Sequence, residues 1–405
     1  MEDSNLVNTQ SIANILTLRY DPTIRPRLPP KIWKDFISEL KPISHTHLEH
    51  IICEEIFKKI DNANSKDICI ALSGGIDSTL MLCLTRKIFP NLKINAVSIR
   101  FANSVDETGQ AARIAENFEA EHHIIDVENY LEELPKAISI IKQPFWDLHW
   151  YHVVKKSSQI GNILISGDGG DEVFGGYTFR YEKFIKNLKT NSRPIDKIHN
   201  YLDCHIRDHV PDQEKLFGQK IPFSWSMIDK QMMQFFDNPL TPIEQVFLAD
   251  YNGKLLYNFN PINSKICNHF GVEVIAPMLS EKIISYGLSI PWNLKYDEIN
   301  GIGKLPLRIL LKENNAINLV SKQKLGFNVN TINLWKTHGF DICSQFLESS
   351  HVIENDWINR NWVKKYLKKE QEDIRYINKF YGLLALEIWY RLFISKDMSK
   401  DEKLI

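Results

Sequence analysis

The chain has 405 residues, which suggests two or three domains at roughly 150 residues each. Its 49 Lys and Arg residues against 50 Asp and Glu residues leave a formal net charge of -1, and 43% of the residues are hydrophobic. This composition is typical of soluble globular proteins and excludes a disordered tail, a fibre or a protein that binds nucleic acid through bulk charge. The first four residues are acidic and polar, and no run approaches 18 apolar residues, so we expect a cytoplasmic protein without a membrane partner.

The first 45 residues or so are predicted to form an irregular arm. Asp21-Pro22 and the prolines at 26, 29 and 30 interrupt regular structure, because proline lacks an amide donor and has a fixed φ. We favour a packed linker over a proline-rich docking peptide.

From about residue 50, short β-branched runs alternate with helical patterns. This alternation predicts an α/β fold with a doubly wound parallel sheet, whose ligands bind at the carboxyl ends of the strands. The predicted strands are residues 68–72, 94–100, 123–127 and 162–166, and the predicted helices are residues 79–88, 107–118 and 130–141. Beyond about residue 180 the strand signal fades, and residues 245–256 and 356–393 have helical spacing, so the C-terminal part is expected to be mostly helical.

Metal-binding motifs of cysteine and histidine are weak. The six cysteines are widely spaced with no Cys-x-x-Cys pair, so neither a disulfide scaffold nor a cysteine zinc site is predicted. His205 and His209 are four residues apart on a predicted helix, but the segment lacks the glutamate of a zincin motif. We interpret both as structural histidines.

The sharpest motif is SGGIDS at residues 73–78, between a predicted buried strand and a helix. Its glycines permit a tight turn, and the following helix directs unpaired N–H groups and its positive dipole end toward an anion. The motif lacks the Gly-Lys-Ser/Thr of a Walker A loop. Asp77 and Ser78 add a magnesium-capable carboxylate and a hydroxyl, so we predict a phosphate-binding loop.

A second motif, SGDGGDEVFGGY at residues 166–177, follows another predicted strand. Five glycines and three acidic residues in twelve make a loop that a purely structural role would hardly need. If both loops follow neighbouring parallel strands, Asp77 and Asp171 can share a cation.

Together the two motifs resemble the synthetase domain of asparagine synthetases, within the N-type ATP pyrophosphatases (PP-loop enzymes). The resemblance continues in order over roughly residues 50–395. Its further elements are His122 and His123, PFWD at 144–147, FGVE at 270–273 with Pro277, Gly303 and Lys304 through Arg308, Lys324 with Gly326 and Phe327, and LEIW at 386–389. It implies an adenine nucleotide alpha hydrolase-like (HUP-type) domain over residues 46–340, with C-terminal helices 341–405 packed on it.

The resemblance further implies an AMP-forming ligase that uses ATP and Mg²⁺ to activate a carboxylate for attack by an amine. It assigns Asp77 and Asp171 to magnesium, and Asp168, Lys324 and Glu273 to catalysis. The cofactor-binding residues implied for ATP are Leu72, Ser73, Gly74, Gly75, Asp77, Ser78, Ser98, Gly167, Lys304 and Arg308.

The chain also departs from asparagine synthetases, which begin with a glutaminase domain and its cysteine nucleophile. Residue 2 here is Glu2, and only some fifty residues precede the synthetase region, so no glutamine hydrolysis is expected. The family has glutamate at the position of Asp168 and arginine at that of Ile275, and its Asp-x-x-Arg element is missing near residues 258–265. Losing charged groups changes which carboxylate can bind.

Several functions therefore remain open. Asparagine formation from aspartate and ammonia is the first hypothesis, and amidation or cyclisation of another carboxylate is its rival. A tRNA-modifying ATP pyrophosphatase is disfavoured by the balanced charge and absent cysteine pairs. The last alternative is a catalytically silent nucleotide-binding scaffold. The expected partners are a small carboxylate and ammonia or another amine, with a separate ammonia-supplying glutaminase and a homodimer left open.

Overall fold

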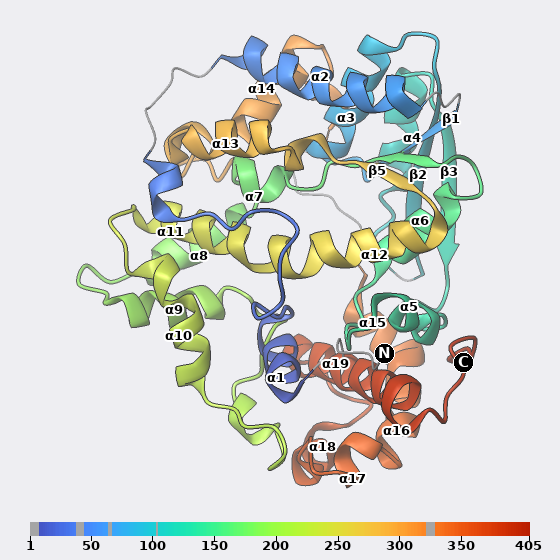
Figure 1. Ribbon diagram of the computed structural model, residues 1–405, viewed down its shortest axis with the longest axis vertical. Helices are drawn as coiled ribbons and strands as arrows, with labels where there is room; N and C mark the ends of the chain where they lie inside the picture. Colours follow the sequence, from blue (N-terminus) through green and yellow to red (C-terminus); the bar gives the residue numbers. More distant parts are fainter. Residues whose placement is uncertain (1–7, 38–43, 64–66, 103, 321–328) are drawn as a thin grey trace.

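The computed structural model describes residues 8–37, 44–63, 67–102, 104–320 and 329–405 (Figure 1). Lys324, Gly326 and Phe327 lie outside these ranges.

Within the described residues, five parallel strands form one sheet in the order β3-β2-β1-β4-β5. The strands are β1 (Asp67–Ala71), β2 (Lys93–Phe101), β3 (Glu121–Val127), β4 (Ile163–Ile165) and β5 (Glu273–Ile275). The four predicted strands and the doubly wound class are confirmed. The strand order reverses between β1 and β4, which is where such sheets bind ligands. Strand β5 was not predicted, because three residues are too few to show a pattern.

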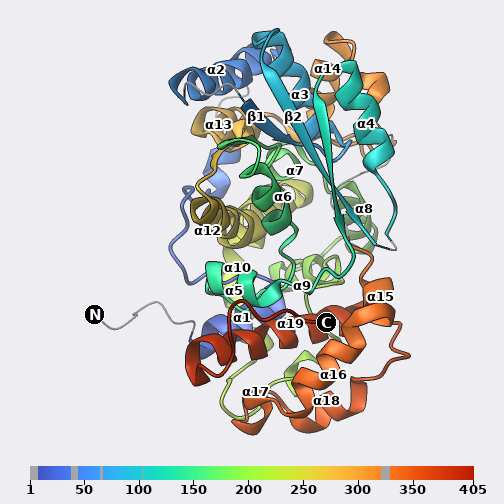
Figure 2. The same ribbon diagram turned by 90° about the vertical axis from the view of Figure 1, so that its right-hand side faces the viewer.

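Strands β1, β2, β4 and β5 have residues in both cores, one on each face of the sheet, whereas the edge strand β3 is partly exposed. Ile68 and Ile70 of β1 enter one core, while Cys69 and Ala71 enter the other. The first core is covered by α2 (His45–Ala63), α3 (Ile76–Ile88), α4 (Thr108–Asn117), α13 (Glu281–Ser289) and α14 (Leu305–Glu313). The second is covered by α5 (Leu134–Ile141), α6 (His149–Ser157), α12 (Asn260–Phe270) and α19 (Ile374–Tyr390) (Figure 2).

Most of the other helices extend the molecule below the sheet in the view of Figure 1, while α7 lies at the level of the sheet. These other helices are α7 (Gly170–Phe174), α8 (Thr178–Asn187), α9 (Pro194–Asp203), α10 (Trp225–Phe236), α11 (Pro242–Asp250), α15 (Thr331–Leu334), α16 (Phe340–Glu348), α17 (His351–Glu354) and α18 (Arg360–Tyr366). A π-helical segment, Tyr251–Phe259, joins α11 to α12 and is kinked at Gly253. The C-terminal part is therefore mostly helical, as predicted.

The prediction of an irregular N-terminal arm is wrong for residues 9–18, which form α1 (Thr9–Leu18). The Asn8 side chain caps this helix by accepting from the amide of Ser11, and every residue from Ser11 to Leu18 is buried. In both views α1 lies against α19. The prolines that suggested an arm begin only at Pro22, after the helix has ended.

Three helix predictions also need correction. His205 and His209 do not share a helix, because α9 ends at Asp203 and the chain turns there. The helix predicted over 130–141 begins at Leu134. The helical pattern over 356–393 is divided, since α18 ends at Tyr366 and α19 begins at Ile374.

Candidate functional site

The loop after β1 is a tight turn closed by its own serines. Gly74 has φ +75°, and Gly75 caps the start of α3. The Ser78 hydroxyl accepts from the Ser73 amide at 3.2 Å and donates to the Gly75 carbonyl at 3.2 Å. The loop is therefore held at the helix N-terminus, where backbone N–H groups and the helix dipole favour an anion.

The loop after β4 packs directly on this turn, because β1 and β4 are paired neighbours. A Cβ atom on Gly167 would lie 2.6 Å from the Cβ of Asp77, and one on Gly170 would lie 2.5 Å from the Asp77 Oδ1. Any side chain at either position would displace Asp77. These glycines allow the two loops to approach closely.

Asp77 and Asp171 are brought together by Lys304. The Lys304 Nζ donates to the Asp77 Oδ2 and lies 2.9 Å from the Asp171 Oδ1, and Lys304 is only 7% exposed. Burial lowers the pKa of Lys304, but the carboxylates of Asp171 and Asp77 outweigh it and hold the pKa above its ordinary value. The three side chains form a buried cluster with two negative charges and one positive charge.

The donor set suits a magnesium ion, which protein sites commonly bind through one or two carboxylates and substrate phosphates. Asp77 and Asp171 already share one cation, the Lys304 ammonium, so their oxygens lie within reach of a common positive charge. Across the described residues there is no cluster of three or more His, Cys, Asp or Glu side chains suited to a metal. A metal held by Asp77 and Asp171 would therefore keep positions for water and for substrate phosphates.

A cavity of about 230 Å³ opens beside these loops. Its lining includes Ser73, Asp77, Ser78, Gly167, Asp168, Asp171, His149 and Asn263. The Asn263 amide donates to Asp168 at 3.2 Å. Burial raises the pKa of Asp168, against hydrogen bonds from Ser166 and Asn263 that lower it. A carboxylate in this state is a better proton acceptor than an exposed one.

Ser98 and Arg308, two further residues predicted to bind ATP, each donate a hydrogen bond to a backbone carbonyl. Ser98 of β2 donates to the Leu72 carbonyl at 2.6 Å and contacts the His122 ring at 2.9 Å, which anchors the end of β1. Arg308 lies one turn into α14 and donates to the Gly303 carbonyl at 3.0 Å. Lys324 lies outside the described residues.

Glu273 is not brought into the cluster. It begins β5, its side chain is 52% exposed, and it lies 3.7 Å from Lys59 of α2. The carboxyl end of β5, which faces the site, is at Ile275.

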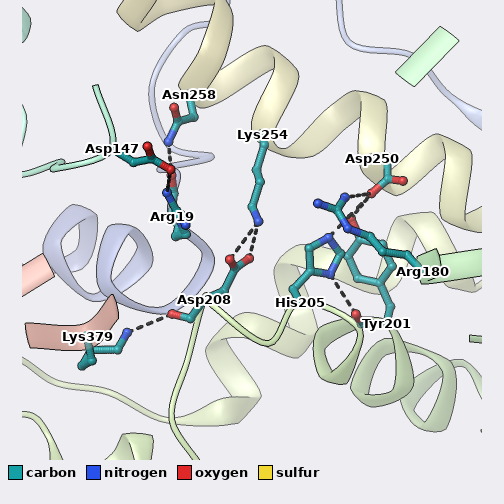
Figure 3. A network of polar contacts seen from close by, with 10 residues as sticks. All are labelled: Arg19, Asp147, Arg180, Tyr201, His205, Asp208, Asp250, Lys254, Asn258 and Lys379. Carbon is teal, nitrogen blue, oxygen red and sulfur yellow. Dashed lines mark hydrogen bonds and ion pairs between the residues drawn. The ribbon is translucent and has the colours of Figure 1, made fainter. Parts of the chain in front are cut away.

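A charged network beside the cavity was missed by the sequence analysis (Figure 3). Arg19, directly after α1, pairs with Asp147 at 2.6 Å, and the Asn258 side chain donates to the Arg19 carbonyl. Asp147 and Asn258 also line the cavity. Burial would raise the pKa of Asp147, but His149 and Arg19 outweigh it and hold the pKa well below its usual range. Arg19 and Asp147 are 128 residues apart, so no local pattern indicates their pairing.

Glu172 and Tyr177 also line this cavity. The Tyr177 hydroxyl donates to Glu172 at 2.5 Å, and the Arg180 guanidinium lies 4.0 Å from the Tyr177 ring centre. Burial and the neighbouring Asp171 raise the pKa of Glu172 to about 7. Both residues lie in the glycine-rich motif, but no local pattern indicates a separate role for either.

The fold and these loops define a parallel α/β protein with a crevice lined by two glycine-rich loops where its strand order reverses. The model of the asparagine synthase family matches residues 63–391. The chain belongs to that family.

The relatives are distant and longer. An asparagine synthetase (glutamine-hydrolysing) of Bacillus subtilis is 23% identical over 409 residues, covering 90% of this chain and 60% of that protein. A putative asparagine synthetase of Mycobacterium bovis is 29% identical over 299 residues, covering 64% of this chain and 44% of that protein. This chain thus spans about 60% or less of the length of these two relatives.

Among solved structures, the NMN synthetase of Francisella tularensis is 17% identical and aligns with a TM-score of 0.27, covering 57% of this chain and 94% of that one. An ammonia-dependent NAD synthetase of Campylobacter jejuni is also 17% identical with a TM-score of 0.27, covering 49% and 99%. In the described part of this chain, no helix combines the length and apolarity needed to cross a membrane.

Proposed function

We propose that the protein is an ATP-dependent, AMP-forming ligase that activates a carboxylate and joins it to an amine. The observation that supports this most strongly is the cluster of Asp77, Asp171 and Lys304 at the reversal of the strand order. Carboxylates that share a cation beside an anion-binding helix start suit a nucleotide with its metal.

The residues around the cavity have separate proposed roles. The amides and hydroxyls of residues 73–78 would hold the pyrophosphate part of ATP, and Asp77 and Asp171 would hold Mg²⁺. When bound, Mg²⁺ screens the negative charge that develops between the phosphates. Lys304 would exchange its carboxylate partners for phosphate oxygens, and Arg308 would add a second positive charge. Outside the described residues, Lys324 is proposed to stabilise charge at the reacting centre.

Asp168 is the proposed base. It lines the same cavity as Ser73 and Asp77, and burial raises its pKa, so it can accept a proton from an incoming ammonium group. Once the amine is neutral, its lone pair can attack the activated carbonyl. We assign no catalytic role to Glu273 on the strength of its exposed position.

The preferred reaction is the formation of asparagine from aspartate and ammonia, with a separate protein supplying ammonia. Amidation or cyclisation of another carboxylate is the second candidate. It is favoured by Ile275, an apolar side chain only 3% exposed at the end of β5, where asparagine synthetases have arginine. An apolar side chain there cannot pair with a charged group of the substrates, as that arginine can.

The test is pyrophosphate release from ATP and Mg²⁺ by the purified protein. Aspartate and a panel of other carboxylates are each added with and without ammonium. Release that depends on one acid supports the ligase and identifies that acid. Release that is absent for every acid while ATP still binds would favour the scaffold hypothesis instead.

A further inference from the structure

A second cavity of about 420 Å³ lies on the other side of Asp168 from the nucleotide loops. Its walls are formed by α12, by β5 and the residues that follow it, and by Glu55 and Lys59 of α2. Arg27 and Leu28 also line it. The proposed steps at the nucleotide loops do not use this cavity.

The two cavities meet at Asp168. Four residues line both of them: Asp168, Leu255, Phe259 and Asn263. The hydrogen bond from the Asn263 amide to the Asp168 carboxylate, at 3.2 Å, crosses this boundary. A group bound in the second cavity can therefore reach Asp168 from the side opposite to the nucleotide loops.

The second cavity is much larger than a molecule of ammonia. A molecule the size of water, which ammonia resembles, occupies about 30 Å³ in the liquid. Sites for small organic molecules typically measure about 300–1,000 Å³. At about 420 Å³, this cavity falls within that range.

The lining suits an amino acid or a similarly sized amine. One wall is apolar and includes Val274, Ile275 and Ala276. The α12 wall presents hydrogen-bonding side chains, namely Asn260, Asn263, Ser264 and Asn268. At the solvent side lie Arg27, which donates to Ser264, and Lys59, which lies 3.7 Å from Glu273. The rim therefore carries charges of both signs, which suits the ammonium and the carboxylate of an amino acid.

We propose that the second cavity binds an organic primary amine of amino-acid size and presents its nitrogen to Asp168 as the nucleophile of the ligase. This inference rests on the proposed function. The amine enters as an ammonium ion and gives one proton to Asp168. Its nitrogen then forms a bond to the carbonyl carbon of the acyl adenylate, the carbon–oxygen bond to AMP breaks with its electron pair leaving on AMP, and the second proton passes to solvent.

The experiment uses the acid found by pyrophosphate release and compares nucleophiles of different size. Hydroxylamine traps any acyl adenylate as a hydroxamate and is close to ammonia in size. Ammonium chloride and the common L-amino acids, with their carboxamides, are then supplied separately, and amide formation is measured. The proposal predicts that one organic amine has a kcat/KM at least about tenfold above that of ammonium, a difference that contacts along its body can supply.

A substitution in the second cavity separates this site from the nucleotide site. Ser264 of α12 lines the second cavity and is not among the residues that line the first. Ser264→Phe should raise KM for the organic amine at least about tenfold by filling the space that the amine occupies. Hydroxamate formation and carboxylate-dependent exchange of pyrophosphate into ATP should remain within about twofold, since the amine takes no part in activation. Ser264→Ala is the matched control. It removes the hydroxyl without filling the cavity, so it should raise KM for the amine far less than Ser264→Phe.

Three outcomes contradict the proposal. Ammonium could be the best natural amine, Ser264→Phe could leave KM for the organic amine unchanged, or it could raise KM for hydroxylamine equally. Any of these would show that the second cavity is not the amine site. Absence of hydroxamate and of pyrophosphate exchange in the unmodified protein would instead remove the proposed function itself, and the amine site with it.

Discussion

At the scale of single residues, Lys304 shows how the site is held together. Its backbone has φ 57°, a left-handed conformation that costs a residue with a Cβ about 1 kcal/mol or more. The conformation places its side chain between Asp77 and Asp171, directly before α14 begins. The favourable charge interactions of the cluster offset this local cost.

Removing one carboxylate of this cluster should abolish activity and spare the fold. We expect Asp171→Asn to lower kcat for pyrophosphate release by at least roughly 100-fold, because the amide binds magnesium poorly. Circular dichroism should be unchanged, since Lys304 keeps Asp77 as a partner. Activity within tenfold of the original would remove Asp171 from the metal site.

The close packing around Asp171 and Lys304 can be tested with two glycines. A Cβ atom on Gly176 would overlap the Asp171 carboxylate and the Lys304 side chain, so Gly176→Ala should cost about 1–3 kcal/mol in free energy of unfolding and most of the activity. Gly109 in α4 is the control, because a Cβ there has open space within 4 Å. Gly109→Ala should stabilise the protein by about 0.5–1 kcal/mol in urea unfolding. Equal effects at both positions would contradict this account.

Lys295 provides a pH-dependent test outside the site. It is 1% exposed, it donates to the Gly287 carbonyl at 3.0 Å, and burial lowers its pKa to about 7. Unfolded lysine titrates near pH 10.4, so between about pH 7 and 10 the unfolded chain binds a proton that the folded protein lacks. The free energy of unfolding should therefore gain from Lys295 about 1.4 kcal/mol per pH unit as pH rises through this range.

Lys295→Met removes this contribution. The variant should be more stable than the original protein at pH 7. The difference should shrink toward pH 10, because removing the proton of Lys295 on folding costs less free energy as the pH nears the pKa of the unfolded lysine. Urea unfolding at four or five pH values measures both curves. Parallel curves would mean that Lys295 keeps its proton in the folded protein.

At the scale of elements, α1 contacts parts of the chain that are distant in sequence. Lys379 of α19 donates to the Leu16 carbonyl near the end of α1 and to the Asp208 carbonyl at 2.9 Å (Figure 3). Arg19, the next residue after α1, reaches Asp147 beside the cavity. A helix near the N-terminus thus connects the C-terminal helix to the wall of the candidate site.

This connection predicts a large effect of core mutations in α1. Leu16 is 2% exposed and packs near Gly382 of α19, so Leu16→Ala should cost about 2–4 kcal/mol in free energy of unfolding. Gln10→Ala is the control, because the Gln10 amide donates to Asn14 on the same helix and the residue is only half-buried. Denaturant unfolding of both variants checks the difference, and a change below about 1 kcal/mol for Leu16→Ala would show that α1 is weakly packed.

The elements also show why some of the fold was predictable. The β-branched runs of β1 and β2 and the glycines of the two loops are local signals, and they indicated the sheet and both halves of the cluster. Helix α1 shows no polar stripe, because its polar residues Asn14 and Thr17 are buried with Asp21 and Gln213 as partners. Lys304 bridges Asp77 and Asp171, which are far apart in sequence. No local sequence pattern indicates this contact, and only the structure shows it.

At the scale of the whole molecule, one buried sheet supports two cavities that meet at one carboxylate. The nucleotide loops follow β1 and β4, and the second cavity extends along β5 and α12. This arrangement suits a reaction in two steps, with activation on one side of Asp168 and attack by the amine on the other. Both steps depend on the activated carboxylate being an acyl adenylate.

The most direct test follows oxygen from the carboxylate to AMP. The acid that supports pyrophosphate release is labelled with ¹⁸O in its carboxyl group, and the AMP and pyrophosphate formed are analysed by mass spectrometry. If the carboxylate attacks the α-phosphorus of ATP, AMP receives one labelled oxygen and pyrophosphate receives none. Unlabelled AMP, or label in phosphate released with ADP, would contradict activation by adenylation and with it the proposed function.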